Sequence, residues 1–210
     1  HKEMLFGILE KLFPLKVFCT VGNLNNHIGV PLTILSVSDA HHILIVEMGS
    51  NHPGEIALLC DIVKPDSGLI TNIGAAHLEF FKTEAGVFKE KRTLFEYIKK
   101  RAQGPFVANY EDKFLCKLQG YEKLTFFDSS RDLSDRKDGD VNIIDYRLNK
   151  NILELSFNKK KYLIENKNLF GDFNFKNLIA CLILSYQLFP KNLELIIEAS
   201  KQVSLPSNNR

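Results

Sequence analysis

The chain has 210 residues, of which 45% are hydrophobic and 25% charged, and its formal net charge is +2. This composition is that of a globular protein and is too apolar for a disordered chain. A nearly neutral chain with only short apolar runs is expected to bind neither nucleic acid nor membrane, and no signal peptide is recognisable at its start. We therefore expect a cytoplasmic protein. Zinc ligation and a disulfide framework are not expected either, because the cysteines lie far apart: Cys19, Cys60, Cys116 and Cys181.

The first 128 residues alternate between apolar strands and amphipathic helices. An amphipathic helix that ends at Pro14 comes first, and it begins without an N-terminal cap. The runs at 42–47 and 69–73 are continuously apolar, with a helical pattern between them, which is typical of a parallel sheet covered on both faces. The predicted strands are 17–21, 42–47, 69–73, 106–108 and 124–127, and the predicted helices are 54–64, 83–100 and 112–118.

The pattern changes after Asp128. Residues 129–140 are polar and rich in turn formers, which predicts an exposed loop. Alternating patterns then predict antiparallel strands, and two helices close the chain. We expect an α/β fold with a mostly parallel sheet flanked by helices, and a small antiparallel β meander that forms a subdomain at about 141–169. The later elements are expected at 141–148, 152–157, 162–166, 174–188 and 193–203.

Polar side chains follow two neighbouring strands. Glu47 ends the apolar run at 42–47, Asn72 lies near the end of the next strand, and His77 comes in the following loop. Ligands of an open parallel sheet gather at the carboxyl ends of its strands. A carboxylate and an imidazole on adjacent loops suit a divalent cation. The alternative is a glutamate facing water and a histidine without a role.

Lys91 occupies an unusual place in the helix predicted at 83–100. It follows Val87 by four residues and precedes Phe95 by four, so it falls in the apolar stripe. A buried ammonium is costly unless it is paired or loses its charge. One interpretation is a lysine that extends past apolar neighbours to a carboxylate. The other is an amine neutralised by chemistry near the strand ends.

The loop at 22–31 is rich in asparagine and glycine and directly follows a strand. Such a loop presents several hydrogen-bonding groups to a polar ligand, although asparagine and glycine are also the usual turn formers. No GxxxxGK[ST] motif occurs in the chain, so these residues alone do not support a nucleotide site.

Several segments occur in the order that they have in one enzyme family. They are 23–33 (NLNNHIGVPLT), 46–56 (VEMGSNHPGEI), 70–79 (ITNIGAAHLE), 171–177 (GDFNFKN) and 208–210 (NNR). Over nearly its whole length the sequence resembles the central ATP-binding domain of the Mur ligases of peptidoglycan synthesis, which has a P-loop NTPase-like fold. Because of the asparagine-rich loop, it is most similar to the members that join D-alanyl-D-alanine to a UDP-N-acetylmuramoyl-tripeptide.

The resemblance implies roles for the strand-end residues. Glu47 would bind the Mg²⁺ that bridges the ATP phosphates. His77 and Lys91 would serve a second Mg²⁺, with Lys91 as a carbamate formed with carbon dioxide, an anionic oxygen donor suited to this metal. The sequence departs from the family at Thr93, where a glutamate is usual.

It also implies ligand contacts. Asn174 would contact adenine, and Arg210 would reach the ribose or phosphates. Asn25 and Asn26 would face the muramoyl-peptide substrate. Phe173 stands where the family commonly has histidine, directly before the adenine-contacting asparagine.

The implied reaction activates a carboxylate. ATP would phosphorylate the terminal carboxylate of the tripeptide, and the amine of D-alanyl-D-alanine would displace phosphate from the acyl phosphate. The family's GKT segment would lie just before residue 1, so we expect this chain to be an inactive fragment of an enzyme. We also expect that enzyme to be a monomer. The alternatives are another Mur-type or folylpolyglutamate-type ligase, and a non-catalytic binding domain of the same fold.

Overall fold

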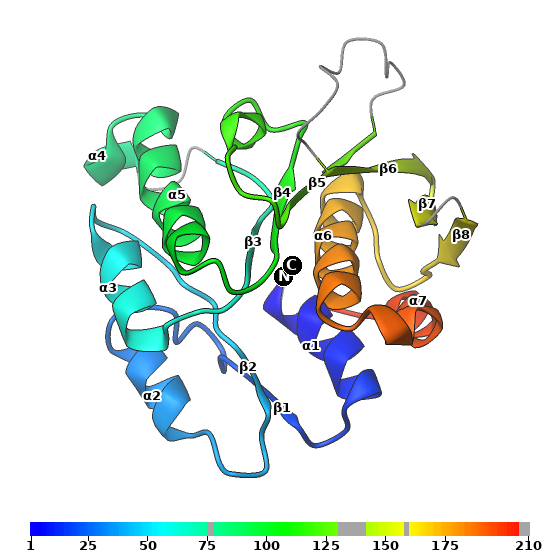
Figure 1. Ribbon diagram of the computed structural model, residues 1–210, viewed down its shortest axis with the longest axis horizontal. Helices are drawn as coiled ribbons and strands as arrows, with labels where there is room; N and C mark the ends of the chain where they lie inside the picture. The colour runs from blue at the N-terminus through cyan, green and yellow to red at the C-terminus, as the bar shows by residue number, and fades with distance from the viewer. Residues whose placement is uncertain (75–77, 130–141, 158–159, 206–210) are drawn as a thin grey trace.

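The computed structural model describes residues 1–74, 78–129, 142–157 and 160–205 (Figure 1). The helices in these ranges are α1 (Lys2–Leu12), α2 (Gly29–Leu35), α3 (Glu55–Val63), α4 (Leu78–Phe81), α5 (Glu84–Arg101), α6 (Asp172–Leu188) and α7 (Leu193–Gln202). The strands are β1 (Val17–Cys19), β2 (Ile43–Ile45), β3 (Gly68–Ile70), β4 (Phe106–Asn109), β5 (Leu124–Asp128), β6 (Asn142–Asn149), β7 (Ile152–Phe157) and β8 (Lys160–Glu165). Short 3₁₀ helices follow β4 (Leu115–Lys117) and α6 (Pro190–Asn192).

The strands form two sheets. Strands β1 and β2 pair in parallel, and a larger sheet has the order β3-β4-β5-β6-β7-β8. Pairing is parallel from β3 to β6 and antiparallel from β6 to β8. Strand β6 therefore belongs to both parts of the sheet, because it pairs in parallel with β5 and antiparallel with β7. The expected architecture, a mostly parallel sheet flanked by helices with a small antiparallel meander, is confirmed.

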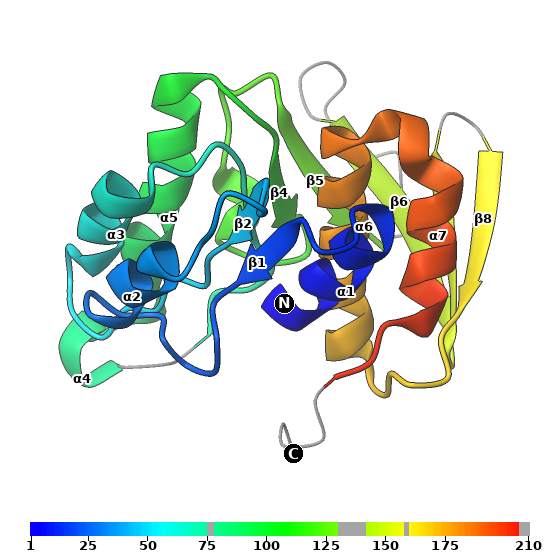
Figure 2. The same cartoon turned by 90° about the horizontal axis from the view of Figure 1, so that it is seen from below.

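Helices cover both faces of the larger sheet, as Figure 2 shows. Neighbouring residues of the fully buried strand β5 serve opposite faces because side chains alternate along a strand. Phe127 joins the core formed with α1, α6 and α7, whereas Phe126 joins the core formed with α5. Burial on both sides explains why the run at 124–127 in β5 is apolar apart from Thr125 and why the run at 106–108 in β4 is apolar throughout.

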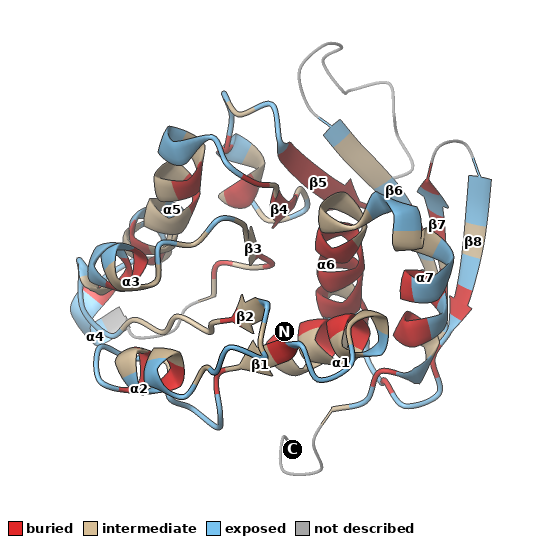
Figure 3. Cartoon of the chain, turned by 60° about the horizontal axis from the view of Figure 1, so that its bottom comes forward, coloured by how far each residue is buried: buried red, intermediate tan, exposed pale blue. Residues whose placement is uncertain are grey.

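Helix α6 lies in the middle of the fold and is buried along most of its length (Figure 3). Its apolar residues surround the helix instead of forming one stripe, as expected for a helix packed on several sides. It contacts α1, α7 and strands β3 and β4. Among the described helices, none is long and apolar enough to cross a membrane.

Two local predictions are wrong. The segment at 112–118 forms only the 3₁₀ turn Leu115–Lys117. Asp112 Oδ1 accepts hydrogen bonds from the N–H groups of Phe114 at 2.9 Å and Leu115 at 3.0 Å, which caps the start of this turn, and the turn ends where the backbone becomes extended at Leu118.

The loop predicted at 22–31 also ends early, because α2 already begins at Gly29. Asn26 Oδ1 accepts from the N–H groups of Ile28 at 3.1 Å and Gly29 at 2.9 Å. These bonds satisfy donors that the first turn of a helix leaves free. Pro31 is compatible with this helix because it lies in the first turn.

Strand β8 forms one end of the larger sheet. Two lysines begin this strand, and both are ion-paired. Lys160 lies 2.8 Å from a carboxylate oxygen of Glu194 on α7, and Lys161 lies 2.9 Å from one of Glu154 on β7. The exposed Leu163 follows them on the same strand.

Candidate functional site

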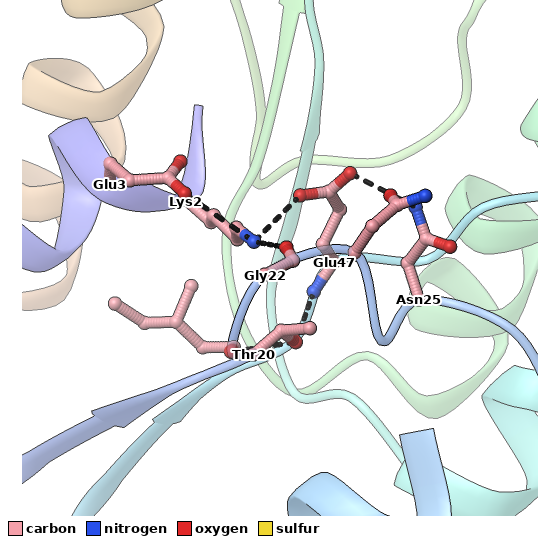
Figure 4. A network of polar contacts seen from close by, with 8 residues as sticks. Lys2, Glu3, Thr20, Gly22, Asn25 and Glu47 are labelled. Atoms are coloured by element: carbon pink, nitrogen blue, oxygen red, sulfur yellow. Dashed lines mark hydrogen bonds and ion pairs between the residues drawn. The ribbon is translucent and has the colours of Figure 1, made fainter. Parts of the chain in front are cut away.

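The polar residues of interest lie where strands β2 and β3 end and helix α1 begins. Figure 4 shows the part of this region around Glu47, which follows β2 by two residues. Asn25 comes from the loop before α2, and Lys2 comes from the first turn of α1. The carboxyl ends of two strands and the amino end of a helix thus converge on one place, which is where α/β proteins bind ligands.

Glu47 is held by three neighbours while part of its surface stays open. Asn25 Nδ2 donates a hydrogen bond to Oε1 at 3.1 Å, and Lys2 Nζ lies 3.5 Å from Oε2. The Glu47 N–H donates to Thr20 Oγ1 at 3.0 Å. The side chain is 43% exposed, so its carboxylate has a fixed place and remains available to a ligand.

Lys2 is a buried cation, with only 6% of its side chain exposed. It donates a hydrogen bond to the carbonyl of Gly22 and also faces Glu3, with 3.4 Å between Nζ and Oε1 (Figure 4). A buried ammonium needs such partners. Lys2 therefore places a positive charge directly beside the Glu47 carboxylate, at the point where an anionic ligand would meet the helix.

Lys91 reaches the end of β3 from helix α5. Its Nζ donates a hydrogen bond to the carbonyl of Asn72 at 3.3 Å. Burial lowers the pKa of the Lys91 ammonium, and the negative charge of Asp112 opposes this shift only in part. A lowered pKa increases the fraction of neutral amine, which is the nucleophilic form of lysine.

A chain of neighbouring residues links the surroundings of Glu47 to those of Lys91. Lys2 contacts Glu47, and the adjacent His1 has its Nε2 atom 2.5 Å from Thr71 Oγ1. Thr71 precedes Asn72, whose carbonyl accepts from Lys91. Glu47 therefore lies beside the start of α1, and Lys91 is connected to it through Asn72, Thr71 and His1. His77, which was expected beside Lys91, lies outside the described residues.

Glu90 is a residue that the sequence analysis did not single out. It is buried, and its carboxylate accepts hydrogen bonds from the N–H groups of Gly54 and Ile56, both at 2.8 Å. Its spacing from Val87 is that of the same apolar stripe which drew attention to Lys91. A carboxylate inside that stripe was therefore a visible signal.

The asparagine-rich loop packs closely on the segment after β2. The backbone carbonyl of Asn25 accepts a hydrogen bond from the Gly49 N–H at 2.8 Å, while its side-chain Nδ2 donates to Glu47 and Asn23. A Cβ atom at Gly49 would lie only 2.8 Å from the Asn25 side chain, so this contact requires glycine. Asn25 thus orients Glu47, and Asn26 caps α2.

Asn174 lies in the first turn of α6, and its Nδ2 donates to the carbonyl of Phe170 at 2.8 Å. Phe170 and Phe173 on either side are exposed. The ring of Phe173 lies 6.5 Å from that of His1, which places this turn next to the start of α1. Arg210 lies outside the described residues.

The donor set around Glu47 suits a magnesium ion that a phosphate helps to bind. No cluster of three or more histidine, cysteine, aspartate or glutamate residues with metal-binding geometry occurs in the described parts of the chain. Mg²⁺ does not require one, because it is usually bound by one or two carboxylates together with substrate phosphates and water. The half-exposed Glu47 carboxylate meets that requirement.

Comparison with known proteins agrees with this geometry. Residues 1–185 match the family described as Mur ligase middle domain. A relative from Escherichia coli, named UDP-N-acetylmuramoyl-tripeptide–D-alanyl-D-alanine ligase, is 43% identical over 94 residues, which are 45% of this chain and 20% of the relative. The matched part is thus a minor fraction of that protein's length.

Solved structures give the same result. A crystal structure of MurF from Acinetobacter baumannii superimposes with a TM-score of 0.78 at 26% identity, over 98% of this chain and 44% of the other. MurF from Thermotoga maritima in complex with ADP superimposes with a TM-score of 0.67, also at 26% identity, over 98% of this chain and 45% of the other. The family match covers most of the chain, and the chain therefore belongs to the Mur ligase family.

Proposed function

We propose that the chain is the central part of an ATP-dependent ligase that joins D-alanyl-D-alanine to a UDP-N-acetylmuramoyl-tripeptide. The observation that carries the proposal is the link from Glu47 through the start of α1 to the end of β3, where Lys91 bonds Asn72, in a chain that is similar to a relative of that name. The first turn of α1 supplies free N–H groups and the positive end of a helix dipole, which suit the phosphates of ATP.

Glu47 supplies a hard oxygen ligand for Mg²⁺ at the nucleotide phosphates. Lys91 becomes an anionic ligand for a second Mg²⁺ by carbamylation: the neutral amine nitrogen attacks the carbon of carbon dioxide and loses a proton, which leaves an N-carboxylate. The lowered pKa of Lys91 supports this step, because only the neutral amine reacts. We assign His77 to the same metal. When bound, Mg²⁺ neutralises the charge that develops on the transferred phosphoryl group.

The remaining residues are assigned to the ligands. Asn174 contacts adenine from the first turn of α6, and Arg210 binds the ribose or phosphates. Asn25 and Asn26 line the side toward the muramoyl-peptide. Because the amide of Asn25 also donates to Glu47, this residue connects the peptide side of the site with the metal side.

The reaction proceeds in two steps. An oxygen of the terminal tripeptide carboxylate attacks the γ-phosphorus, and ADP leaves, which gives an acyl phosphate. The amine of D-alanyl-D-alanine then attacks the acyl carbon, and phosphate leaves with one oxygen from the original carboxylate while the amine loses a proton. We also propose that the enzyme acts as a monomer in the cytoplasm.

The test uses the complete ligase with a tripeptide whose terminal carboxylate carries ¹⁸O at both oxygens. We expect ADP, phosphate and ligated product in equal amounts, with one ¹⁸O atom in each phosphate, and D-alanyl-D-alanine as the preferred acceptor over single amino acids. Preference for a single amino acid or for a folate substrate would contradict the assignment in favour of another ligase. Binding of nucleotide without any turnover would indicate a non-catalytic domain.

A further inference from the structure

The Glu90 carboxylate is buried in an unusual way. Only 7% of the residue is exposed, and it has no ion-pair partner among the residues that the structure describes. Oε2 accepts from the Gly54 N–H at 2.8 Å, and Oε1 accepts from the Ile56 N–H at 2.8 Å and from Ser50 Oγ at 3.3 Å. The buried Glu90 carboxylate is therefore stabilised by hydrogen bonds from neutral donors of one short segment.

This segment is the amino end of α3, which has no side-chain cap at its own N-cap position. Gly54 occupies that position with a φ angle of 93°, which is favourable only for glycine. The first turn of a helix leaves N–H groups unsatisfied and attracts negative charge. Glu90 provides both the acceptors and the charge from α5. One helix thus caps another across a separation of more than thirty residues.

The capped segment also continues the chain that leaves β2 and carries Glu47. After Glu47, two sets of hydrogen bonds fix the chain. The Gly49 N–H donates to the backbone carbonyl of Asn25, and further along the Ser50 hydroxyl and the Gly54 N–H donate to the Glu90 carboxylate. The residue after Glu90 is Lys91, which holds the other strand end through Asn72. A single turn of α5 therefore holds the segments that follow both β2 and β3.

We infer that Glu90 is a positioning residue, which fixes the loop at 48–56 and thereby sets the place of the Glu47 carboxylate relative to Lys91. This inference rests on the proposed function, in which Glu47 serves the Mg²⁺ at the ATP phosphates and Lys91 serves a second Mg²⁺. Removal of a group that orients a metal ligand without contacting the metal commonly lowers metal affinity about 10- to 100-fold. The effect of Glu90 should therefore be measurable although it does not touch the metal.

A purely structural cap would affect stability alone, and the chain offers a matched control for that case. Asn166 is fully buried and its Nδ2 donates to the carbonyls of Ser200 at 2.8 Å and Val203 at 2.9 Å. It satisfies backbone groups at the end of α7, and its Oδ1 accepts from the N–H groups of Asn168 and Leu169, so none of these hydrogen bonds involves a proposed site residue. Asn166→Ala should lower stability to a degree comparable with Glu90→Ala while leaving the site intact.

The experiment compares Glu90→Ala, Glu90→Gln and Asn166→Ala in the complete ligase. Binding of ADP is measured by calorimetry over a series of Mg²⁺ concentrations, alongside the Mg²⁺ dependence of turnover. We expect Glu90→Ala to raise the Mg²⁺ concentration for half-maximal ADP binding about tenfold. Glu90→Gln should give a smaller increase, because it keeps one acceptor oxygen and turns an amide donor toward the backbone N–H groups. Asn166→Ala should behave like the wild type in both titrations.

Unchanged Mg²⁺ dependence in both Glu90 variants would overturn the inference and reduce Glu90 to a helix cap. Should Glu90→Ala fail to fold, Glu90→Gln carries the test alone with the same criterion. Glu47→Gln separates this outcome from failure of the proposed function. If Glu47→Gln also leaves the Mg²⁺ dependence unchanged, Glu47 is not a metal ligand, whereas an effect of Glu47→Gln without one of Glu90 contradicts only the positioning role.

Discussion

Helices α5 and α6 have nearly the same length, 18 and 17 residues, but they bury different chemistry. The buried positions of α6 are apolar except for Asn177 and Ser185. Those of α5 include Glu90, and the partly buried Lys91 follows it. Both helices pack against the same sheet, from opposite faces. Helix α6 therefore contributes mainly to stability, whereas α5 gives up part of its apolar contact to hold the strand ends.

The strongest test of this comparison is Lys91→Ala on α5. We expect activity of the complete ligase to fall about 1000-fold, because an anionic group that stabilises phosphoryl transfer is lost. The fold should persist, since the ammonium itself gains little from its surroundings. Activity assays and circular dichroism check both parts. Added formate or acetate should restore part of the activity by replacing the carbamate, and full activity without addition would remove Lys91 from the site.

The opposite result is expected for Leu182→Ala on α6. Leu182 is completely buried, and its truncation leaves a cavity, so the free energy of unfolding should fall by about 3 kcal/mol. Denaturant unfolding measures this loss. Turnover per folded molecule should not change. The exposed Leu195 provides a control, because Leu195→Ala should alter stability by no more than about 0.5 kcal/mol. A large loss of turnover in folded Leu182→Ala would contradict the assignment of a mainly stabilising role to α6.

Glu47→Gln tests the segment after β2, which α5 holds through Glu90. The substitution keeps the shape of the side chain and removes its charge, so turnover should fall about 50-fold at limiting Mg²⁺. Raising the Mg²⁺ concentration should recover part of the loss. Steady-state kinetics at several Mg²⁺ concentrations measure both effects. Kinetics equal to those of the wild type at limiting Mg²⁺ would show that α5 supports a loop without a metal ligand.

The smallest effect concerns the stability cost of Lys91 itself. Burial lowers the pKa of its ammonium below 10.5, against the opposing charge of Asp112. Between the lowered pKa and 10.5 the unfolded chain binds more protons here than the folded one, so this residue adds stability as pH rises through that window. Below the window both states hold the proton, and the burial cost is constant.

Lys91→Met removes this titration. The variant should therefore be more stable than the wild type at pH 7, and the difference should shrink as the pH rises toward 10. Denaturant unfolding at pH 7, 8, 9 and 10 measures the trend. Lys89→Met, at an exposed position on the same helix, should show no comparable convergence with the wild type. A gap that stays constant for Lys91→Met would contradict the effect of burial on this amine.

The sequence predicted most of the fold because its strands and long helices carry the pattern that burial imposes. The run at 106–108 is apolar since both faces of β4 are covered, and the same holds for the run at 124–127 in β5 apart from Thr125. Short elements were misjudged where their ends are set by side-chain hydrogen bonds. Asp112 and Asn26 each accept the first N–H groups of a short helical segment, and neither contact changes the hydrophobic pattern.

The site was predictable where a residue broke its local pattern. Lys91 stood out inside an apolar stripe, and Glu47 stood out at the end of a strand. Glu90 was passed over because its partners, the N–H groups of Gly54 and Ile56, lie more than thirty residues away in the sequence. Asn25 was predicted to face the substrate, but its bond to Glu47 depends on how the loop packs against Gly49. Such long-range pairings leave no periodic trace.

The paired lysines of β8 have a consequence for self-association. A strand at the end of a sheet presents unpaired N–H and C=O groups that invite pairing with another chain. Charged side chains oppose that pairing, and Lys160 and Lys161 are fixed on this strand by Glu194 and Glu154. The exposed Leu163 would otherwise favour a β-zipper between copies. The ion pairs of β8 thus protect the protein against aggregation at the end of the sheet that is built by the meander.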